Sequence, residues 1–374
     1  MKVMTLLGTR PELIKLCLVL KELDRHFDHV LVHSGQNYDY ELNQVFFEDL
    51  GVRKPDEFLD AAGETAMETV AQVLVKTDQM LEKHKPDAFL IYGDTNSCLA
   101  VIAAKRRKIP IFHMEAGNRC FDDRVPEEIN RKIVDHLSDI NMPLTEHGRK
   151  YLEREGIRPE RIIRTGSCMR EVLEHYRPQW EKSDVISRLG LKEKGYYLFS
   201  SHREENVDRE DHLLAILNSM NQLAEATGRD VIFSAHPRTR KRIDAIGGFQ
   251  FHPKVQYMKP LGFHDYIHLQ VHSSCTLSDS GTIMEESALL GFPAVSIRQA
   301  HERPEGMDEG VLVVCPPKLD RLMDSVKVVE AASEARGRQP FPVRDYQVDK
   351  VSQAVAKIIL SYRDYVSRVV WSED

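Results

Sequence analysis

The chain has 374 residues, of which 42% are hydrophobic and 29% are charged, and its formal net charge is -7. This composition is typical of a globular protein, and the length exceeds what one hydrophobic core usually serves, so we expect two domains. The acidic balance argues against a nucleic-acid partner or an anionic membrane surface, because no strong positive field is available to release counterions.

Neither the N-terminus nor the cysteines indicate export. The first eight residues, MKVMTLLG, form too short an apolar run for a secretory signal, and no stretch reaches the roughly 18 apolar residues of a transmembrane helix. The six cysteines are scattered without a CxxC pair, which favours neither a disulfide framework nor a zinc ribbon. We therefore expect a reduced, cytoplasmic protein without a membrane span.

Short apolar runs of strand length recur along the chain, each followed by a turn signal and a longer amphipathic stretch. We expect strands at residues 3–7, 30–33, 88–92, 109–114, 196–200, 231–235, 275–277 and 294–297. Continuous apolar runs are typical of strands buried on both faces, and their alternation with helices predicts right-handed crossovers and parallel sheets. The predicted fold class is therefore α/β, doubly wound.

A polar, turn-rich stretch at residues 171–195 interrupts this alternation, and a second strand-helix series begins at residue 196. It indicates a hinge between two Rossmann-like domains that face a cleft. We expect an N-terminal domain at residues 1–168 and a C-terminal domain at residues 169–347. The segment 348–374 has a helical period over most of its length and is expected to pack back on the N-terminal domain.

Three of the expected strands are each followed by a pair of residues with capping-box spacing, which predicts a helix N-terminus there. The pairs are Thr9 with Glu12, Ser201 with Glu204, and Thr282 with Glu285. Capping boxes commonly do no more than begin helices, but polar residues without a capping duty stand beside these, namely Arg10, Lys15, His202, Arg203, Ser280 and Gly281. Free N–H groups at the carboxyl edge of an α/β sheet favour anions, so the three ends are candidate ligand sites.

Acidic residues follow two strands that are neighbours in the sequence. Asp94 in GDTNS ends one strand, and Glu115 in HMEAGNR ends the next. If both strands are parallel, both carboxylates lie at one edge, and each must be paired or hydrogen-bonded to avoid a large desolvation cost. Such acids together with His202 would suit proton transfer at a carbon atom. Clustered acids could instead bind a metal ion, but no HExxH or EF-hand spacing occurs and the histidines are dispersed.

A helix is expected from residue 126, with Glu127 and Glu128 in its first turn. Its apolar positions predict a face in the core; they are Ile129, Ile133, Val134 and Leu137. Acids in a first turn stabilise the helix dipole, which explains one of the two glutamates. We expect Arg131 to form a surface ion pair with Glu127, four residues earlier, and Lys132 and Asp135 to lie on the same solvated or ion-paired side.

Two further residues stand near element ends. His236 follows a strand, where a lone histidine is more often structural than catalytic. Glu286 lies one residue beyond the third pair and could hold a ribose hydroxyl pair through both carboxylate oxygens.

Eight motifs occur in order along nearly the whole chain: GTRPELIK, GDTNS, HMEAGNR, VPEEINR, TGS, SHREEN, SDSGTIMEE and ERPE. In these motifs the chain resembles the non-hydrolysing UDP-N-acetylglucosamine 2-epimerase family. The resemblance implies a glycosyltransferase-B-type fold, with the nucleotide held mainly by the C-terminal domain and the sugar facing the N-terminal one. It also implies that UDP leaves by elimination across C1 and C2, giving a glycal, and re-adds after reprotonation on the other face, without a cofactor.

The resemblance implies site residues, carried over by motif. The acid-base candidates are Asp94, Glu115, Glu127 and His202. The substrate-binding candidates are Arg10, Lys15, Arg131, His236, Ser280, Gly281, Glu286 and Arg303. Which acid removes the C2 proton stays open.

The chain also departs from the family pattern. Thr282 and Met284 replace a glycine and a glutamine of the third strand-end motif, and Asn37 and Tyr38 stand where many members have residues associated with activation by a second UDP-sugar. These stretches look closer to the branch that converts UDP-2-acetamido-2,6-dideoxy-L-talose to UDP-N-acetyl-L-fucosamine. A homodimer and a place in surface polysaccharide precursor synthesis, for capsule or O-antigen, are implied as well. The alternative is a glycosyltransferase of the same fold, which would leave C2 untouched.

Overall fold

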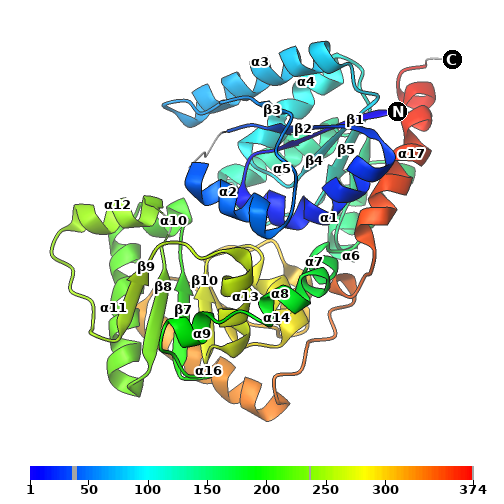
Figure 1. The fold of residues 1–374 in the computed structure, drawn as a ribbon. Helices are drawn as coiled ribbons and strands as arrows, with labels where there is room; N and C mark the ends of the chain where they lie inside the picture. Colours follow the sequence, from blue (N-terminus) through cyan, green and yellow to red (C-terminus); the bar gives the residue numbers. More distant parts are fainter. Residues whose placement is uncertain (36–39, 236, 373–374) are drawn as a thin grey trace. The chain divides into compact units, whose positions relative to one another are not determined.

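The computed structural model describes residues 1–35, 40–235 and 237–372 (Figure 1). The chain folds as two compact units. The first comprises Met1–Glu174 and Arg344–Asp374, and the second comprises His175–Val343. In the described part of the chain, no helix is both long and apolar enough to cross a membrane, and all six cysteines are free thiols.

The first unit is built on a six-stranded parallel sheet of order β3-β2-β1-β4-β5-β6. Its strands are β1 (Lys2–Leu7), β2 (Asp28–His33), β3 (Glu57–Phe58), β4 (Ala88–Tyr92), β5 (Ile111–Met114) and β6 (Ile140–Met142). In the register of the sheet, Met4 of β1 lies between Val30 of β2 and Phe89 of β4. The central strands are buried along nearly their whole length, as their continuous apolar sequences predict.

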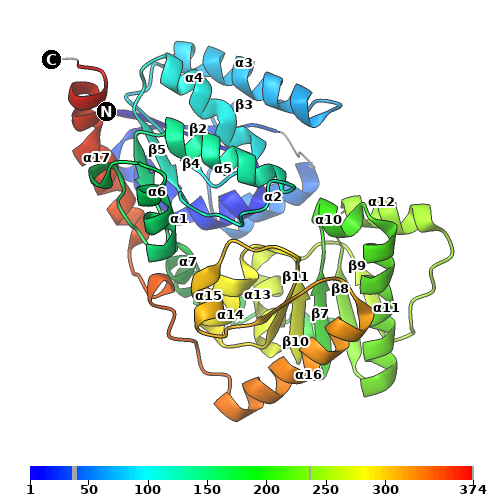
Figure 2. The same ribbon diagram turned by 180° about the vertical axis from the view of Figure 1, so that it is seen from behind.

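Helices cover both faces of this sheet. They are α1 (Arg10–His26), α2 (Tyr40–Asp49), α3 (Ala66–His84), α4 (Val101–Arg106), α5 (Pro126–Leu137), α6 (Glu146–Arg154), α7 (Met169–His175) and α17 (Val351–Val370). Helix α17 packs against α1, at the other end of the chain, as Figures 1 and 2 show. Helices α3, α4 and α5 pack in sequence on the opposite face.

The second unit has a parallel sheet of order β12-β11-β10-β7-β8-β9. Its strands are β7 (Tyr196–Ser200), β8 (Asp230–Ser234), β9 (Val255–Met258), β10 (Cys275–Ser278), β11 (Ala294–Ile297) and β12 (Val313–Cys315). Its helices are α8 (Arg177–Trp180), α9 (Val185–Arg188), α10 (Glu204–Val207), α11 (Glu210–Thr227), α12 (Pro237–Ile246), α13 (Phe263–His272), α14 (Ile283–Leu290), α15 (Pro304–Asp308) and α16 (Leu319–Arg336).

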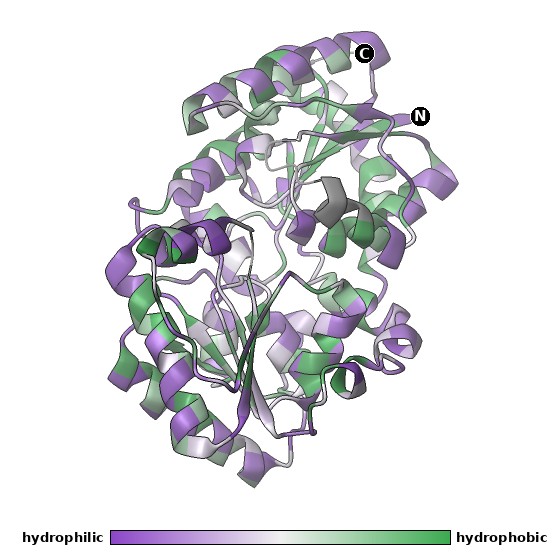
Figure 3. Ribbon diagram, turned by 60° about the vertical axis from the view of Figure 1, so that its left-hand side comes forward, coloured by the Kyte–Doolittle hydropathy of each residue, from purple (hydrophilic) through white to green (hydrophobic). Residues whose placement is uncertain are grey.

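The alternation of side chains along β7 divides the core of this unit into two layers. Tyr197 and Phe199 belong to the cluster that α11 and α16 complete, whereas Tyr196 and Leu198 face α9 and α13. Hydrophilic and hydrophobic residues accordingly alternate along the helices (Figure 3). Helices α11 and α16 therefore turn their apolar residues to the sheet.

The strand order reverses between β1 and β4 in the first sheet and between β7 and β10 in the second. In open α/β sheets, ligands bind outside the carboxyl ends of the strands at such reversal points. The α/β prediction is confirmed, and all eight expected strands are present. Within the described residues, four short strands were not predicted, namely β3, β6, β9 and β12.

Candidate active site

The turn between β1 and α1 carries the first expected capping box, which is confirmed. Glu12 Oε2 accepts hydrogen bonds from the backbone N–H groups of Gly8 at 2.6 Å and Thr9 at 3.1 Å. Glu12 Oε1 accepts a further bond of 2.7 Å from Thr95 Oγ1, in the loop after β4. Burial raises the pKa of Glu12 to about 7, although the three donors act in the opposite direction. The capping residue thus also joins the two loops at the reversal point.

Lys15 of α1 pairs with Glu115 at the end of β5. The distance from Lys15 Nζ to Glu115 Oε2 is 3.0 Å, and the two side chains are only 5% and 12% exposed. Asn118 Nδ2 donates to Glu115 Oε1 at 3.1 Å. Glu115 has a backbone φ of 64°, in the left-handed region that is unfavourable for a residue with a Cβ atom. Two residues predicted from different motifs therefore meet, and a strained backbone presents one of them.

Asp94, after β4, is held by Arg131 of α5. Arg131 Nε and Nη2 each lie 2.7 Å from Asp94 Oδ2, and Asn130 Nδ2 donates to the Asp94 carbonyl at 2.9 Å. The Asp94 side chain keeps 28% of its surface exposed, whereas that of Arg131 keeps 3%. The guanidinium also contacts Glu128 at 2.8 Å. The predicted surface pair of Arg131 with Glu127 is therefore wrong, because the arginine is buried between two other carboxylates.

Helix α5 turns a polar face toward the strand ends. Glu128 is buried and accepts hydrogen bonds from the N–H groups of Cys120 and Phe121 at 3.0 Å, which closes the loop after β5 onto the helix. Asp135, expected on the solvated side, is 1% exposed, and Ile129, expected in the core, is 51% exposed. Both expectations are wrong because the helix is rotated so that its charged ridge meets the polar loops, whose backbone amides need acceptors.

The other residues of this helix follow expectation in part. Val134 is buried in the core, and Lys132 is exposed and paired with Asp123 at 2.7 Å. Glu127 is partly exposed, and no hydrogen bond or ion pair joins its side chain to another described residue. Arg10, at the start of α1, has its guanidinium 5.4 Å from the centre of the Phe46 ring.

In the second unit, Asp279 after β10 organises the loop after β7. Its carboxylate accepts hydrogen bonds from Ser201 Oγ at 2.7 Å and from the N–H groups of His202 and Arg203 at 3.0 Å and 3.1 Å. Asn206 Nδ2 donates a fourth bond at 3.1 Å. Burial disfavours the charge, but His202 and these donors hold the pKa of Asp279 well below its ordinary value. Asp279 thus joins both loops at the second reversal point.

Ser201 Oγ donates to Asp279, whereas a capping role was expected for this residue. The side chain of its expected partner, Glu204, lies outside the described part of the structure. His202 lies beside the same carboxylate, with Nδ1 3.1 Å from Asp279 Oδ1, and its side chain is 41% exposed. His236 lies outside the described residues, as do Asn37 and Tyr38 of the departing motif.

The third expected capping box is wrong. Thr282 precedes α14 without a side-chain capping bond, and its hydroxyl lies 2.9 Å from that of Ser280. Glu285 pairs with Arg303 at 3.2 Å, and both side chains are buried, so an internal ion pair replaces the cap. A Cβ atom on Gly281 would stand 3.3 Å from Glu302 Oε1, which leaves little room for a side chain there.

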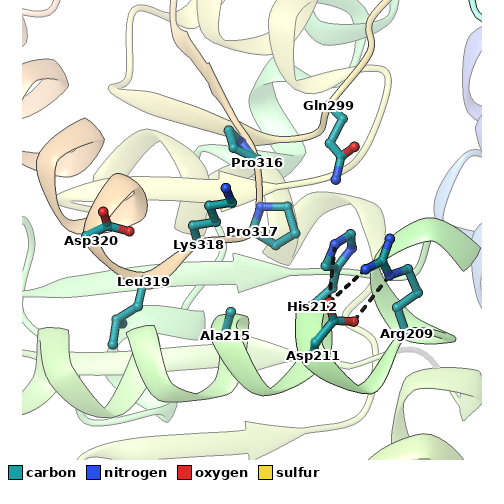
Figure 4. Close-up of a pocket in the computed structure, with 10 residues that line it drawn as sticks. All are labelled: Arg209, Asp211, His212, Ala215, Gln299, Pro316, Pro317, Lys318, Leu319 and Asp320. Atoms are coloured by element: carbon teal, nitrogen blue, oxygen red, sulfur yellow. Dashed lines mark hydrogen bonds and ion pairs between the residues drawn. The ribbon is translucent and has the colours of Figure 1, made fainter.

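Glu286, one residue further along α14, is 6% exposed and accepts a 2.7 Å hydrogen bond from Gln270 Nε2. The predicted residues of the second unit that the structure describes thus lie near the start of α14 and the loop after β7. A separate hollow of about 520 Å³ lies between the starts of α11 and α16, and no residue predicted from the sequence lines it (Figure 4).

Sequence reasoning missed the partners that hold the predicted residues. They are Glu128, Asn130, Asp135 and Asp279. Asp279 stands directly after a strand, as Asp94 nearly does, and that position was the available signal. Glu128 and Asp135 lie seven residues apart on one helix face, a polar spacing that an apolar periodicity does not reveal.

Comparison with known proteins gives consistent matches. A family model described as UDP-N-acetylglucosamine 2-epimerase matches residues 21–360. The structure of UDP-N-acetylglucosamine 2-epimerase from Rickettsia bellii is similar with a TM-score of 0.91 at 50% identity, over 100% of both chains. That of the Methanocaldococcus jannaschii UDP-GlcNAc 2-epimerase, in complex with UDP-GlcNAc and UDP, gives 0.89 at 29% identity, over 96% of this chain and 100% of that chain. A Pseudomonas aeruginosa UDP-2,3-diacetamido-2,3-dideoxy-D-glucuronate 2-epimerase is 33% identical over 87% of this chain and 92% of its own.

Proposed function

This chain belongs to the non-hydrolysing UDP-N-acetylglucosamine 2-epimerase family, and on that premise we propose that it inverts C2 of a UDP-2-acetamidosugar. A base removes the C2 proton while the bond from C1 to the UDP oxygen breaks, which gives a 2-acetamidoglycal and UDP. A proton is then delivered to the opposite face of C2, and UDP re-adds at C1. The reaction is neutral in redox terms and consumes no second substrate.

The observation that carries this proposal is the pair of strand-end carboxylates, each held by its own buried cation. Lys15 contacts Glu115, and Arg131 contacts Asp94. An epimerisation needs one group to take a proton and another to return one, and fixed carboxylates can serve in both roles. Asp94 and Glu115 are therefore our acid-base pair, with Glu127 as a further candidate because its carboxylate is not tied to a described partner.

The second unit would hold UDP. The start of α14, with Ser280 and Gly281, offers backbone N–H groups and hydroxyls that suit a diphosphate. Glu286 suits the ribose hydroxyls, and His202, kept in place by Asp279, could supply a proton to the departing diphosphate. Arg303 would act on this region through Glu285, and Arg10 would steady the substrate from the first unit.

We further propose a cytoplasmic homodimer that makes a surface polysaccharide precursor. The free thiols support a reducing compartment. The sugar we would test first beside UDP-N-acetylglucosamine is UDP-2-acetamido-2,6-dideoxy-L-talose, because of the departing motifs. The glycosyltransferase alternative is not favoured, since the matched family and the named relatives are 2-epimerases.

Turnover in deuterium oxide tests the reaction. With the correct sugar, one deuterium should enter at C2 of the product, which NMR or mass spectrometry detects. Asp94→Asn and Glu115→Gln should each reduce turnover by roughly 100-fold or more, the scale of a lost acid or base. Asp28→Asn and Glu153→Gln, at exposed surface ion pairs, are the matched controls and should remain near the wild-type rate. Product without C2 deuterium, or near-normal turnover in both site variants, would contradict the proposal.

A further inference from the structure

We propose that a buried group formed by His113, Asp135 and Arg119 positions the two strand-end acids of the first unit. These three residues contact neither acid's carboxylate directly, but they bind the backbone next to both. The inference rests on the proposed function, since it assigns a task to residues that support Asp94 and Glu115.

His113 reaches from β5 to the loop that carries Asp94. Its Nε2 lies 2.8 Å from the carbonyl oxygen of Gly93, the residue immediately before Asp94. A carbonyl can only accept, so the ring must donate from Nε2. The other ring nitrogen, Nδ1, lies 2.9 Å from Asp135 Oδ1, and both side chains are at most 1% exposed. The carboxylate of Asp135 therefore lies directly beside the ring and holds its orientation.

Asp135 reaches from α5 to the loop that carries Glu115. Its two oxygens accept from the N–H of Gly117, two residues beyond Glu115, at 3.1 Å and 3.2 Å. Gly117 has a φ of 78°, and a Cβ atom there would stand 2.4 Å from the carbonyl oxygen of Gly148, so the chain passes closely against α6. A single carboxylate is thus joined to the backbone on the Glu115 side and, through His113, on the Asp94 side.

Arg119 completes the charge balance. Its Nη1 lies 2.7 Å from Asp135 Oδ2 and donates at 2.7 Å to the carbonyl of Asn118, whose side chain in turn donates to Glu115. Its Nε and Nη2 bind Glu155 at 2.8 Å and 2.6 Å. Burial opposes the charge of Asp135, but His113 and Arg119 hold the pKa of this carboxyl below its ordinary value. The Asp135 carboxylate is therefore a fixed negative charge, paired with the Arg119 guanidinium.

Glu115 is the residue that such support should serve. Its left-handed backbone at φ 64° persists only where the surroundings impose it. Its own N–H is bound to the carbonyl of Met142 at 3.1 Å, and the next anchored N–H in this turn is that of Gly117. Loosening Asp135 should let the turn relax and displace the Glu115 carboxylate. Small displacements of a reacting group lower kcat far more than they lower binding.

Asp135→Asn tests this assignment in the full-length enzyme. The variant keeps the size of the side chain but removes its charge and half of its acceptor capacity. We expect kcat to fall about 10- to 100-fold, with KM for the UDP-sugar and the affinity for UDP within about threefold of wild type. Asp28→Asn, at an exposed pair, is the control and should retain wild-type kcat.

Two histidine variants provide an independent readout. His113→Gln retains a side-chain N–H that can donate to Gly93, whereas His113→Ala retains none. If positioning is the task, the glutamine variant should recover a substantial part of the kcat that alanine loses, at comparable melting temperatures. This comparison decides the matter if Asp135→Asn does not fold.

The outcomes separate the two proposals. If Asp94→Asn and Glu115→Gln are inactive while folded Asp135→Asn and His113→Ala keep kcat within twofold of wild type, the positioning group is refuted and the proposed function stands. If Asp94→Asn and Glu115→Gln remain active, the assignment of the acids itself fails. A loss that appears wholly in KM, or equal kcat in the glutamine and alanine variants, would also overturn the inference.

Discussion

Carboxylates at the ends of buried strands are compensated in three different ways in this molecule. A lysine compensates Glu115, an arginine compensates Asp94, and Asp279 is compensated chiefly by hydrogen-bond donors from the loop after β7. An unpaired buried charge would cost several kcal/mol, so some partner was certain. The identity of each partner could not be predicted, because the partners come from elsewhere in the sequence. Lys15, for example, precedes Glu115 by 100 residues.

Glu12 gives a prediction at the same scale, through the dependence of stability on pH. Its pKa is raised in the folded state from 4.5 to about 7, so between these values the native state binds more protons than the unfolded state. The free energy of unfolding should therefore fall as pH rises through this window. Glu12→Gln does not titrate, so the stability of wild type relative to this variant should fall by up to about 3 kcal/mol between pH 4 and pH 8.

Urea denaturation of both proteins at several pH values measures this difference. Glu153→Gln, at an exposed pair on α6, is the control and should show no comparable trend. A constant difference between wild type and Glu12→Gln across the window would mean that hydrogen bonding from Gly8, Thr9 and Thr95 keeps Glu12 ionised in spite of its burial.

At the scale of elements, α5 is a helix that was predicted correctly but with the wrong side facing the core. Its apolar residues predicted the buried face, and Val134 is indeed in the core. However, Glu128, Arg131 and Asp135, spaced i, i+3 and i+7, form a second buried ridge. A periodicity argument based on hydrophobicity assigns such residues to water. Only the polar loops beyond the strand ends supply the partners that make their burial favourable.

Helix α3 gives the prediction for the proposed homodimer. Met67, Ala71 and Val75 recur every four residues on its exposed side, and Met67 and Val75 are 73% and 58% exposed. An exposed apolar stripe of this kind marks an interaction surface, and a second copy of the chain is the partner we propose. Met67→Glu together with Val75→Glu should shift the protein from dimer to monomer in light scattering.

Lys76→Gln, on the same helix, is the control for the loss of association and should leave the dimer intact. A double variant that keeps the mass of a dimer would show that α3 is not the dimer contact. Wild-type protein at the mass of one chain, 43.0 kDa, would contradict the dimer itself.

For the whole molecule, the two units repeat one architecture with different charges at the reversal point. The first unit gathers carboxylates with cations, and the second gathers hydroxyls and a helix start around Asp279. We therefore expect UDP alone to slow amide hydrogen exchange most strongly at residues 201–206 and 279–286, which comprise the loops after β7 and β10 and the helix starts that follow them. Mass spectrometry of peptides from the full-length protein measures this protection.

Uridine, which lacks the diphosphate, serves as the control and should protect these segments less. The hollow between the starts of α11 and α16 is the competing location (Figure 4). Strongest protection at residues 209–215 and 316–320 would place the nucleotide there and remove Ser280 and Glu286 from the site.

The sequence by itself determined the class of the fold, the eight buried strands and the motifs that mark the strand ends. These follow from local properties, since a continuous apolar run is buried wherever it lies. The four missed strands are two to four residues long, and each lies at an edge of its sheet. Their pairing therefore depends on an adjacent strand more than on their own composition. The expected capping box of Thr282 and Glu285 failed for a related reason, because Glu285 pairs with Arg303, a tertiary partner that a local pattern does not contain.

Only the tertiary structure decided which charges are neighbours. Lys15 meets Glu115, Arg131 meets Asp94, and Asp279 gathers the loop after β7 because parallel strands bring their carboxyl ends to one edge. The energy of a charge depends on the distance to its partner and on its exclusion from water, and neither quantity is a property of sequence order. Candidate acids could therefore be read from the chain, whereas the cations and amides that hold them could not.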